Sequence, residues 1–391
     1  TGDGAVPGDV AATFRNQLDE AVGAMMVSDV PFGAFLSGGI DSSAIVALMA
    51  RRSSQPIRTF AVGFEESGYS ELDAAQTVAR HCRTEHHALT LRTQDVCDLL
   101  VDAARWRDAP VAEPADLPML LLAREASRSV KMVLTGEGSD ESLGGYPKHL
   151  LELGVGPYQS IPAALRQRLL EPGIAVLPYG ARRLRTAAAA MSLADAVDRL
   201  PRWFGALSVD EVTALIGRRP QLNGYRYPFE TEAAASPLRK ILYFDQTSWL
   251  PDNLLERGDR MTMAASIEAR MPFLDHRLIE FVSRLPDRIR LRAPREKWLL
   301  REAMKPLLPR STLQRRKVGF RMPVHLWLRN ELRPLLHELL QGADSFCRRR
   351  MDPAVIDRYI EQHASQRHNH EKPLWMLLNL EIWARHMRLT A

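Results

Sequence analysis

Seven residues near the start of the chain combine small and acidic side chains in a pattern that suits phosphate chemistry. They are Ser37-Gly38-Gly39-Ile40-Asp41-Ser42-Ser43. Glycine lets the backbone approach phosphate oxygens without a side-chain clash, and free N–H groups at the start of a following helix attract an anion. The serines add hydroxyl donors, and an aspartate tolerates phosphate when a Mg²⁺ ion lies between them. The pattern predicts a loop that binds pyrophosphate and magnesium.

A second segment, Thr135-Gly136-Glu137-Gly138-Ser139-Asp140-Glu141, also mixes glycines with carboxylates. Taken alone, it fits a plain turn. Beside the first loop, its Asp140 and Asp41 could share one magnesium ion, and Glu137 is a carboxylate available for proton transfer. The two segments together predict a catalytic site for a nucleotide and its metal.

Apolar periodicity predicts the elements that position these segments. We expect helices over 9–28, 42–52, 70–82, 94–107 and 116–128, and strands over 30–36, 58–64, 85–91 and 131–135. Alternating strands and helices predict an α/β fold, a parallel sheet wrapped by helices. Ser70 is the expected N-cap of the third helix, and Asp73 supplies a carboxylate to its first turn. Both glycine segments follow strands, at the sheet edge where ligands bind.

After residue 146 the pattern changes to one that is mainly helical and interrupted by prolines. We therefore expect a nucleotide-binding core over 1–150 and a mainly helical region over 151–391.

Composition excludes several classes of protein. No apolar run approaches the length that spans a membrane. The 3 cysteines form no C-x-x-C pair, which predicts reduced thiols and a cytoplasmic location. The net charge is +5, but the arginines are dispersed, so we expect no nucleic-acid surface.

The first loop resembles that of the PP-loop ATP pyrophosphatases, which have the adenine-nucleotide alpha-hydrolase-like fold. Further motifs resemble the synthetase domain of the glutamine-dependent asparagine synthetase family. They are LSGGIDSS at 36–43, FAVGF at 60–64, TGEGSDE at 135–141, GGY at 144–146, LLERGDRMTMAASIEARMPFLDHRL at 254–278, EKWLLREA at 296–303 and RRKVGFRMPVHLWLR at 315–329.

The resemblance implies a carbon–nitrogen ligase that uses ATP and Mg²⁺. Aspartate would be activated as β-aspartyl-AMP with release of pyrophosphate, and ammonia would then convert it to asparagine. The resemblance also assigns roles to residues. Leu36 and Val62 would contact adenosine; Ser37, Gly38, Gly39, Asp41, Ser42 and Ser43 would hold pyrophosphate and Mg²⁺; Thr135 and Gly136 would line the AMP and acyl site; Asp140 would be the second metal ligand; Glu137 would be the base; Lys297 would stabilise the charged phosphate.

The residues alone leave alternatives open in the C-terminal half. Lys297 lies among charged neighbours that also fit a surface ladder of ion pairs. Asp259, Arg260, Glu268 and Arg270 fit either a buried polar network or a solvated face. Pro272 to Asp275 predicts a helix break and a restart. Lys317, Gly319 and Phe320 could close a loop over the site.

Glutamine-dependent relatives begin with a glutaminase domain that has an N-terminal cysteine nucleophile, and no cysteine precedes Cys82 here. We therefore expect that domain to be absent from this chain and present in the intact protein; the alternative is a chain that acts with free ammonia or another amine. A specialised relative, such as a β-lactam synthetase or a peptide macrolactam cyclase, is one alternative. An inactive nucleotide-binding module is another. Some members of the family that the chain resembles are dimers and others are monomers, so a homodimer is one possible assembly.

Overall fold

The computed structural model describes residues 9–110, 113–175, 182–205, 207–220, 235–292, 295–316 and 321–389. Its contacts divide the chain into two compact units, the first from residues 1–95, 115–150 and 245–322, and the second from 96–114, 151–244 and 323–391. Residues 245–322 thus return to the unit that carries the sheet. The domain division expected at residue 150 remains a prediction.

The first unit contains a five-stranded parallel sheet in the order β3-β2-β1-β4-β5. The strands are β1 Phe32–Phe35, β2 Arg58–Phe64, β3 Glu85–Leu91, β4 Met132–Leu134 and β5 Glu268–Arg270. Ala34 of β1 aligns with Thr59 on one side and with Leu134 on the other. The central strands are buried because helices cover both faces of a parallel sheet.

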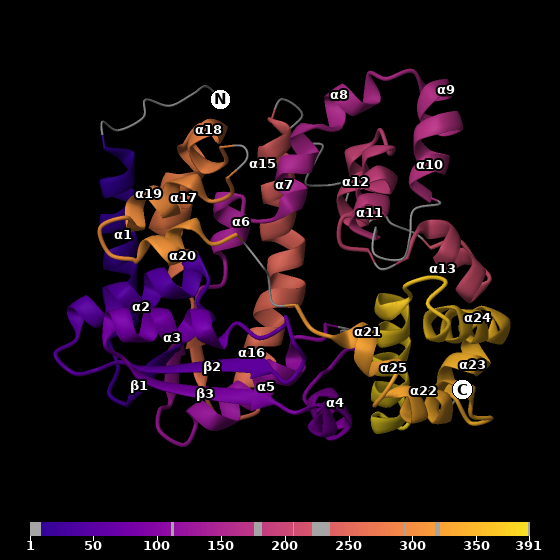
Figure 1. Cartoon of the computed structure of the whole chain (residues 1–391), viewed down its shortest axis with the longest axis horizontal. Helices are drawn as coiled ribbons and strands as arrows, with labels where there is room; N and C mark the ends of the chain where they lie inside the picture. Colours follow the sequence, from indigo (N-terminus) through magenta and orange to yellow (C-terminus); the bar gives the residue numbers. More distant parts are fainter. Residues whose placement is uncertain are drawn as a thin grey trace. The chain divides into compact units, whose positions relative to one another are not determined.

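The chain reverses direction across the sheet after β3, because β4 lies on the other side of β1. Right-handed crossovers therefore put α2 Ile40–Arg52 and α3 Leu72–Cys82 on one face and α5 Asp116–Ala126 on the other (Figure 1). The reversal makes the carboxyl ends of β1 and β4 a topological switch point, where open α/β sheets bind ligands.

Helix α3 begins later than expected. Its N-cap is Glu71, and Ser70 reaches only the amide of Leu72 at 3.5 Å, so the predicted Ser70 cap is wrong. Asp73 does lie in the first turn, as expected. The shift places Glu71 at the start of the helix, beside the first glycine loop.

The remaining elements of the first unit follow the sheet strands. They are α1 Val10–Met25, η1 Thr93–Asp95, α6 Ser139–Leu143, α7 Pro147–Leu153 (which runs into the second unit), η5 Asp245–Leu255, α16 Glu256–Met263, η6 Pro272–Leu274, α17 His276–Arg284, α18 Asp287–Arg290, α19 Trp298–Met304 and α20 Arg310–Gln314. Apolar side chains of α1, α2, α19 and β4, such as Phe14, Leu48, Leu300 and Met132, form one buried core. The predicted helix start after Pro272 is confirmed, with Asp275 capping α17, but the element before Pro272 is strand β5 and not a helix.

The regular elements of the second unit are all helices within the described residues, in agreement with the mainly helical C-terminal region expected from the sequence. Its elements are α4 Val96–Arg105, α8 Val155–Gln159, α9 Ala163–Leu165, η2 Arg166–Leu170, α10 Glu171–Ala175, α11 Arg182–Met191, α12 Ala196–Arg202, α13 Val209–Ile216, α15 Pro237–Phe244, α21 Val324–Trp327, α22 Arg333–Gln341, α23 Phe346–Arg350, α24 Pro353–Ala364 and α25 Glu371–His386. Within the described ranges, no helix has both the length and the apolarity that a membrane crossing needs.

Candidate active site

The two glycine segments meet at the carboxyl ends of β1 and β4. The Ser139 hydroxyl donates to Asp41 Oδ1 at 2.7 Å. Gly136 packs so closely on the first loop that an added Cβ would lie 2.7 Å from the backbone nitrogen of Ser42. The sequence expectation that both segments share one edge of the sheet is therefore confirmed, because neighbouring parallel strands end there.

The first loop is held in a defined shape by its own serines. Ser42 Oγ accepts a hydrogen bond from the Ser37 amide at 3.1 Å, and the Ser43 amide donates to Gly39 O at 3.1 Å. Gly38 has a φ of +74°, and an added Cβ there would lie 2.5 Å from the backbone of Ala75 in α3. Gly39 is the N-cap of α2, so the positive end of that helix faces the loop.

Lys297 lies between the carboxylates of Asp41 and Asp140. Its Nζ is 2.5 Å from Asp41 Oδ1 and 2.7 Å from Asp140 Oδ1, and the residue is only 2% exposed. Burial alone would lower the Lys297 pKa, but the charges of Asp140 and Asp41 reverse the effect and raise it. The ammonium form is therefore retained in the interior. The alternative of a surface ion-pair ladder is wrong for Lys297.

The backbone of Lys297 is unusual as well. It has φ 52° and ψ 43°, the left-handed conformation, immediately before α19. A residue with a Cβ adopts this conformation at a cost of about 1 kcal/mol. The ion pairs with Asp41 and Asp140 offset this cost, and the ammonium group lies against both carboxylates.

The two aspartates fit the requirements of a magnesium ion. Their oxygens converge on one positive group, and Mg²⁺ is commonly held by one or two carboxylates together with substrate phosphates. Among the described residues, no set of three or more His, Cys, Asp or Glu side chains gathers into a self-sufficient metal site. A metal here would therefore need phosphate oxygens to complete its coordination.

Glu137 has an incomplete set of partners. Its Oε1 lies 3.4 Å from an Arg257 guanidinium nitrogen, and its buried Oε2 accepts no hydrogen bond from the described residues. Burial raises the Glu137 pKa above its ordinary value, although Arg257 opposes that shift. Arg257 received no role from the sequence, although it lies inside a motif that the resemblance uses.

Two hydroxyl groups of the site also have buried oxygen atoms without a hydrogen-bond partner among the described residues. They are those of Ser43 and Thr135. Native proteins rarely leave buried polar atoms unpaired, so each such atom calls for an explanation. With Glu137 Oε2, they provide three buried polar atoms on the two glycine segments that a ligand could satisfy.

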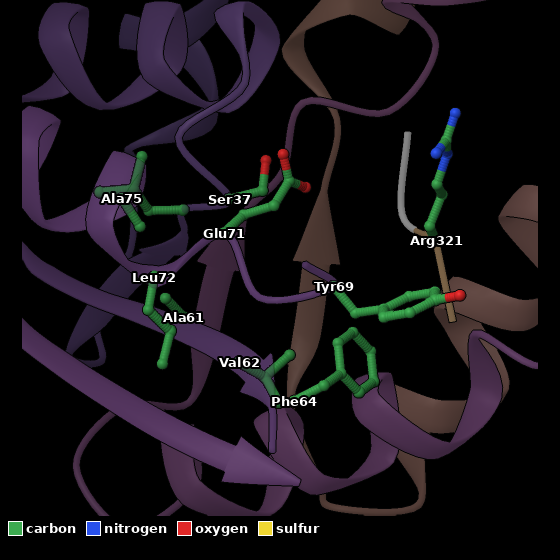
Figure 2. A pocket seen from close by; sticks show the side chains of 10 residues that line it. Ser37, Ala61, Val62, Phe64, Tyr69, Glu71, Leu72, Ala75 and Arg321 are labelled. Atoms are coloured by element: carbon green, nitrogen blue, oxygen red, sulfur yellow. The ribbon is translucent and has the colours of Figure 1, made fainter. Parts of the chain in front are cut away.

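A small pocket that is partly open to solvent adjoins the first loop (Figure 2). Leu36 and Val62, the expected adenosine contacts, both line it. Figure 2 shows Glu71 and Ser37 at a polar end of this pocket, and Tyr69 with Phe64 at an aromatic end.

Tyr69, Glu71 and Arg321 also line the pocket, although they received no role from the sequence. Glu71 also pairs with Arg315 at 2.7 Å, so a basic side chain lies beside the pocket wall. The signal for Tyr69 and Glu71 was their place between β2 and α3, immediately after a strand end, where ligands of α/β sheets bind.

The other candidates from the C-terminal half lie elsewhere. Asp259 and Glu268 are exposed, so the solvated alternative holds for both. Arg270 pairs with Glu268 at 2.7 Å and donates to the carbonyl of Val27 at 2.7 Å, a structural contact. The loop residues Lys317, Gly319 and Phe320 lie outside the described residues.

Comparison with known proteins agrees with this arrangement. The sequence model of the asparagine synthase family matches residues 13–385. Asparagine synthetase [glutamine-hydrolyzing] 1 of Bacillus subtilis is 32% identical over 94% of this chain and 58% of its own length. A putative asparagine synthetase [glutamine-hydrolyzing] of Mycobacterium bovis is 34% identical over 94% of this chain and 56% of its own length.

A more distant relative carries a different name. Amidase chyE of Penicillium rubens is 28% identical over 82% of this chain and 53% of its own length. The chain thus spans little more than half the length of these relatives. The family match nevertheless extends from α1 to α25 and includes both glycine segments and Lys297. The chain belongs to the asparagine synthase family.

Proposed function

We propose that this chain forms amides at the expense of ATP and acts as the synthetase part of an asparagine synthetase. Aspartate would be converted to β-aspartyl-AMP with release of pyrophosphate, and ammonia would then displace AMP. One observation carries the proposal above all others. A buried lysine ammonium and two aspartates converge beside a glycine-rich loop at the start of a helix.

The pocket and the loop suit the two ends of ATP. The apolar side chains of Leu36 and Val62, with the Tyr69 ring, would hold adenine, since purine sites combine apolar walls with few polar groups. Free amides at the start of α2 would bind the phosphates. The nucleotide would then extend from the pocket toward Asp41.

In the first step, a carboxylate oxygen of aspartate attacks the α-phosphorus of ATP, and pyrophosphate leaves. Asp41 and Asp140 would hold Mg²⁺, which when bound neutralises charge on the departing phosphates. The Lys297 ammonium would stabilise negative charge at the α-phosphate, an effect strengthened because water is largely excluded from a buried group.

In the second step, ammonia attacks the acyl carbon, AMP leaves, and one proton must be removed from nitrogen. Glu137 would take that proton, because its raised pKa makes its carboxylate a stronger base than an exposed glutamate. Arg257 would fix the orientation of this carboxylate through the contact at 3.4 Å. Thr135 and Gly136 would line the acyl group.

The relatives named as glutamine-hydrolysing are longer than this chain. We propose that a glutaminase domain supplies ammonia in the intact protein. The synthetase chemistry itself needs only free ammonia, so this chain can be tested with ammonium salts.

The test is ATP–pyrophosphate exchange, with and without L-aspartate and Mg²⁺, followed by a product assay with ammonium. We expect exchange that requires both aspartate and Mg²⁺, and formation of asparagine. Exchange that ignores aspartate would retain the adenylating chemistry but assign another acyl substrate, as in a specialised relative. ATP binding without exchange for any carboxylate would favour a nucleotide-binding module instead.

A further inference from the structure

A buried cluster of charged and polar side chains lies behind the two aspartates and takes no part in the proposed chemistry. Its members are Glu141, Tyr146, Lys148, His149 and Asp245. Asp245 and His149 are fully buried. Burial of charges is costly unless each group is paired, so a cluster of this size calls for a reason.

Asp245, the first residue of η5, is the centre of the cluster. Its Oδ1 accepts a hydrogen bond from Lys148 Nζ at 2.8 Å, and its Oδ2 is 2.8 Å from His149 Nε2. His149 Nδ1 accepts from the Tyr146 amide at 3.2 Å, so in the neutral ring the proton is on Nε2 and points to Asp245. One carboxylate therefore fixes the start of α7.

The same element also holds the other end of this segment. Gln246 Nε2 donates to the Glu141 carbonyl at 3.0 Å, and the Tyr146 hydroxyl donates to Glu141 Oε1 at 2.5 Å. Two adjacent residues of η5 thus secure the chain on both sides of the Gly144–Tyr146 turn.

That turn supports the candidate metal ligand directly. The amides of Gly144 and Gly145 donate to the Asp140 carbonyl at 3.1 and 3.0 Å. Gly145 leaves no room for a side chain, because an added Cβ would overlap Asp140 Oδ1 and the Cε atom of Lys297. A shift of the turn toward the site would therefore displace Asp140 or Lys297.

We propose that Asp245 is a positioning residue that holds the Gly144–Tyr146 turn against Asp140 and Lys297 and thereby sets the affinity for a magnesium–nucleoside triphosphate. The inference rests on the proposed function for the identity of the ligand. Asp245 forms hydrogen bonds with Lys148 and His149, which directly follow the turn. Its effect is carried through Lys148, His149 and the turn.

The experiment compares MgATP binding by calorimetry in the whole chain and in Asp245→Asn, which keeps the size of the side chain but removes its charge. Loss of a residue that orients metal ligands typically weakens metal affinity by 10- to 100-fold, so we expect the MgATP Kd to rise about tenfold. The KM for MgATP should rise in parallel, with kcat at saturating MgATP within about twofold of the original chain.

The matched control is Glu381→Gln, the same acid-to-amide change at a buried carboxylate of the second unit. It should leave MgATP affinity unchanged. If Asp245→Asn does not fold, Tyr146→Phe decides, because it removes only the hydroxyl bonded to Glu141 and should raise the Kd by a smaller factor.

A folded Asp245→Asn or Tyr146→Phe variant with the original Kd would overturn the inference. Equal weakening in Glu381→Gln would do so too, since affinity would then follow general stability. The proposed function fails separately. If the original chain binds MgATP but catalyses no carboxylate-dependent exchange, the function is wrong, while the Kd comparison still decides the role of Asp245.

Discussion

Glu381, which is fully buried, and Glu137, which is partly buried, lie one in each compact unit and have very different surroundings. Glu381 in α25 has both oxygens occupied. Its donors are Ser345 Oγ, Cys347 N and Arg385 Nε, each at 2.9 Å, and Phe346 N at 3.1 Å. Glu137 contacts Arg257 at 3.4 Å, and its buried second oxygen accepts no hydrogen bond within the described residues.

The pKa values of the two carboxyl groups shift in opposite directions. Burial alone would raise the Glu381 pKa, but the amide of Cys347, the guanidinium of Arg385 and the other donors lower it below its ordinary value. Burial raises the Glu137 pKa, and Arg257 offsets only part of that effect. A satisfied carboxylate stabilises the fold, whereas an incompletely satisfied one keeps its capacity to accept a proton.

The largest effect is expected from Glu137→Gln, which removes the proposed base with little change in shape. General-base catalysis contributes about 10²- to 10⁴-fold, so amide formation should fall by that factor. Aspartate-dependent ATP–pyrophosphate exchange should persist, since adenylation precedes proton removal. Both rates are measured on the same preparation. Undiminished asparagine formation would remove Glu137 from the mechanism.

Glu381→Gln tests whether the fully hydrogen-bonded carboxylate stabilises the fold. We expect the free energy of unfolding to fall by about 3 kcal/mol, because the change leaves Arg385 and two backbone amides around a neutral group. Exchange activity per folded molecule should stay unchanged. The measurement is urea unfolding at neutral pH.

Glu361→Gln is the control for this prediction, since Glu361 is exposed in neighbouring α24 and should change stability by no more than about 0.5 kcal/mol. Equal stabilities of the two variants would show that the contacts of Glu381 do not stabilise the fold.

The pH dependence of stability should have opposite signs at the two kinds of carboxylate. Burial, and then the charge of Asp140, raises the Glu141 pKa from 4.5 to about 7. Between these values the folded chain keeps a proton that the unfolded chain has lost, so stability falls as pH rises, by about 3 kcal/mol. The stability that Glu381 contributes is present above about 4.5. It is lost only on acidification through its lowered pKa.

Urea unfolding of Glu141→Gln and Glu381→Gln from pH 4 to pH 8, with EDTA to remove metal ions, measures both signs. Glu141→Gln should flatten the decline between about pH 4.5 and pH 7, and Glu381→Gln should flatten the acid limb. A Glu141→Gln variant with the original slope would mean that Glu141 is ionised in the folded chain at neutral pH.

Much of the fold followed from local pattern. The strands over 58–64 and 85–91 were predicted to the residue. Strand β5 was missed, since it has three residues with polar ends and exists only through its pairing with β4. Periodicity cannot reveal so short a strand.

The residues of the candidate site also divide into those that the sequence predicted and those that it did not. The two glycine segments were predictable because they follow strands that must end at one edge of the sheet. The residues themselves gave no sign that Lys297 is buried; only the resemblance assigned it a role, since its partner Asp41 lies 256 positions away. Arg257 and Asp245 were missed for a similar reason, because their partners Glu137, Lys148 and His149 are about 100 positions distant in sequence.

The smallest effect is expected from a substitution at the aromatic end of the pocket. This substitution tests how far the ligand-binding part of the first unit extends. Tyr69→Ala removes one wall of the space shared with Leu36 and Val62. Loss of an aromatic contact costs about 1 kcal/mol, so the KM for ATP should rise about fivefold, with kcat unchanged. Tyr69→Phe keeps the ring and should stay within about twofold of the original chain, because stacking on a base does not need the hydroxyl. If Tyr69→Ala keeps the original KM, adenine does not bind in this pocket. The ligand-binding part of the first unit would then be confined to the two glycine segments and Lys297.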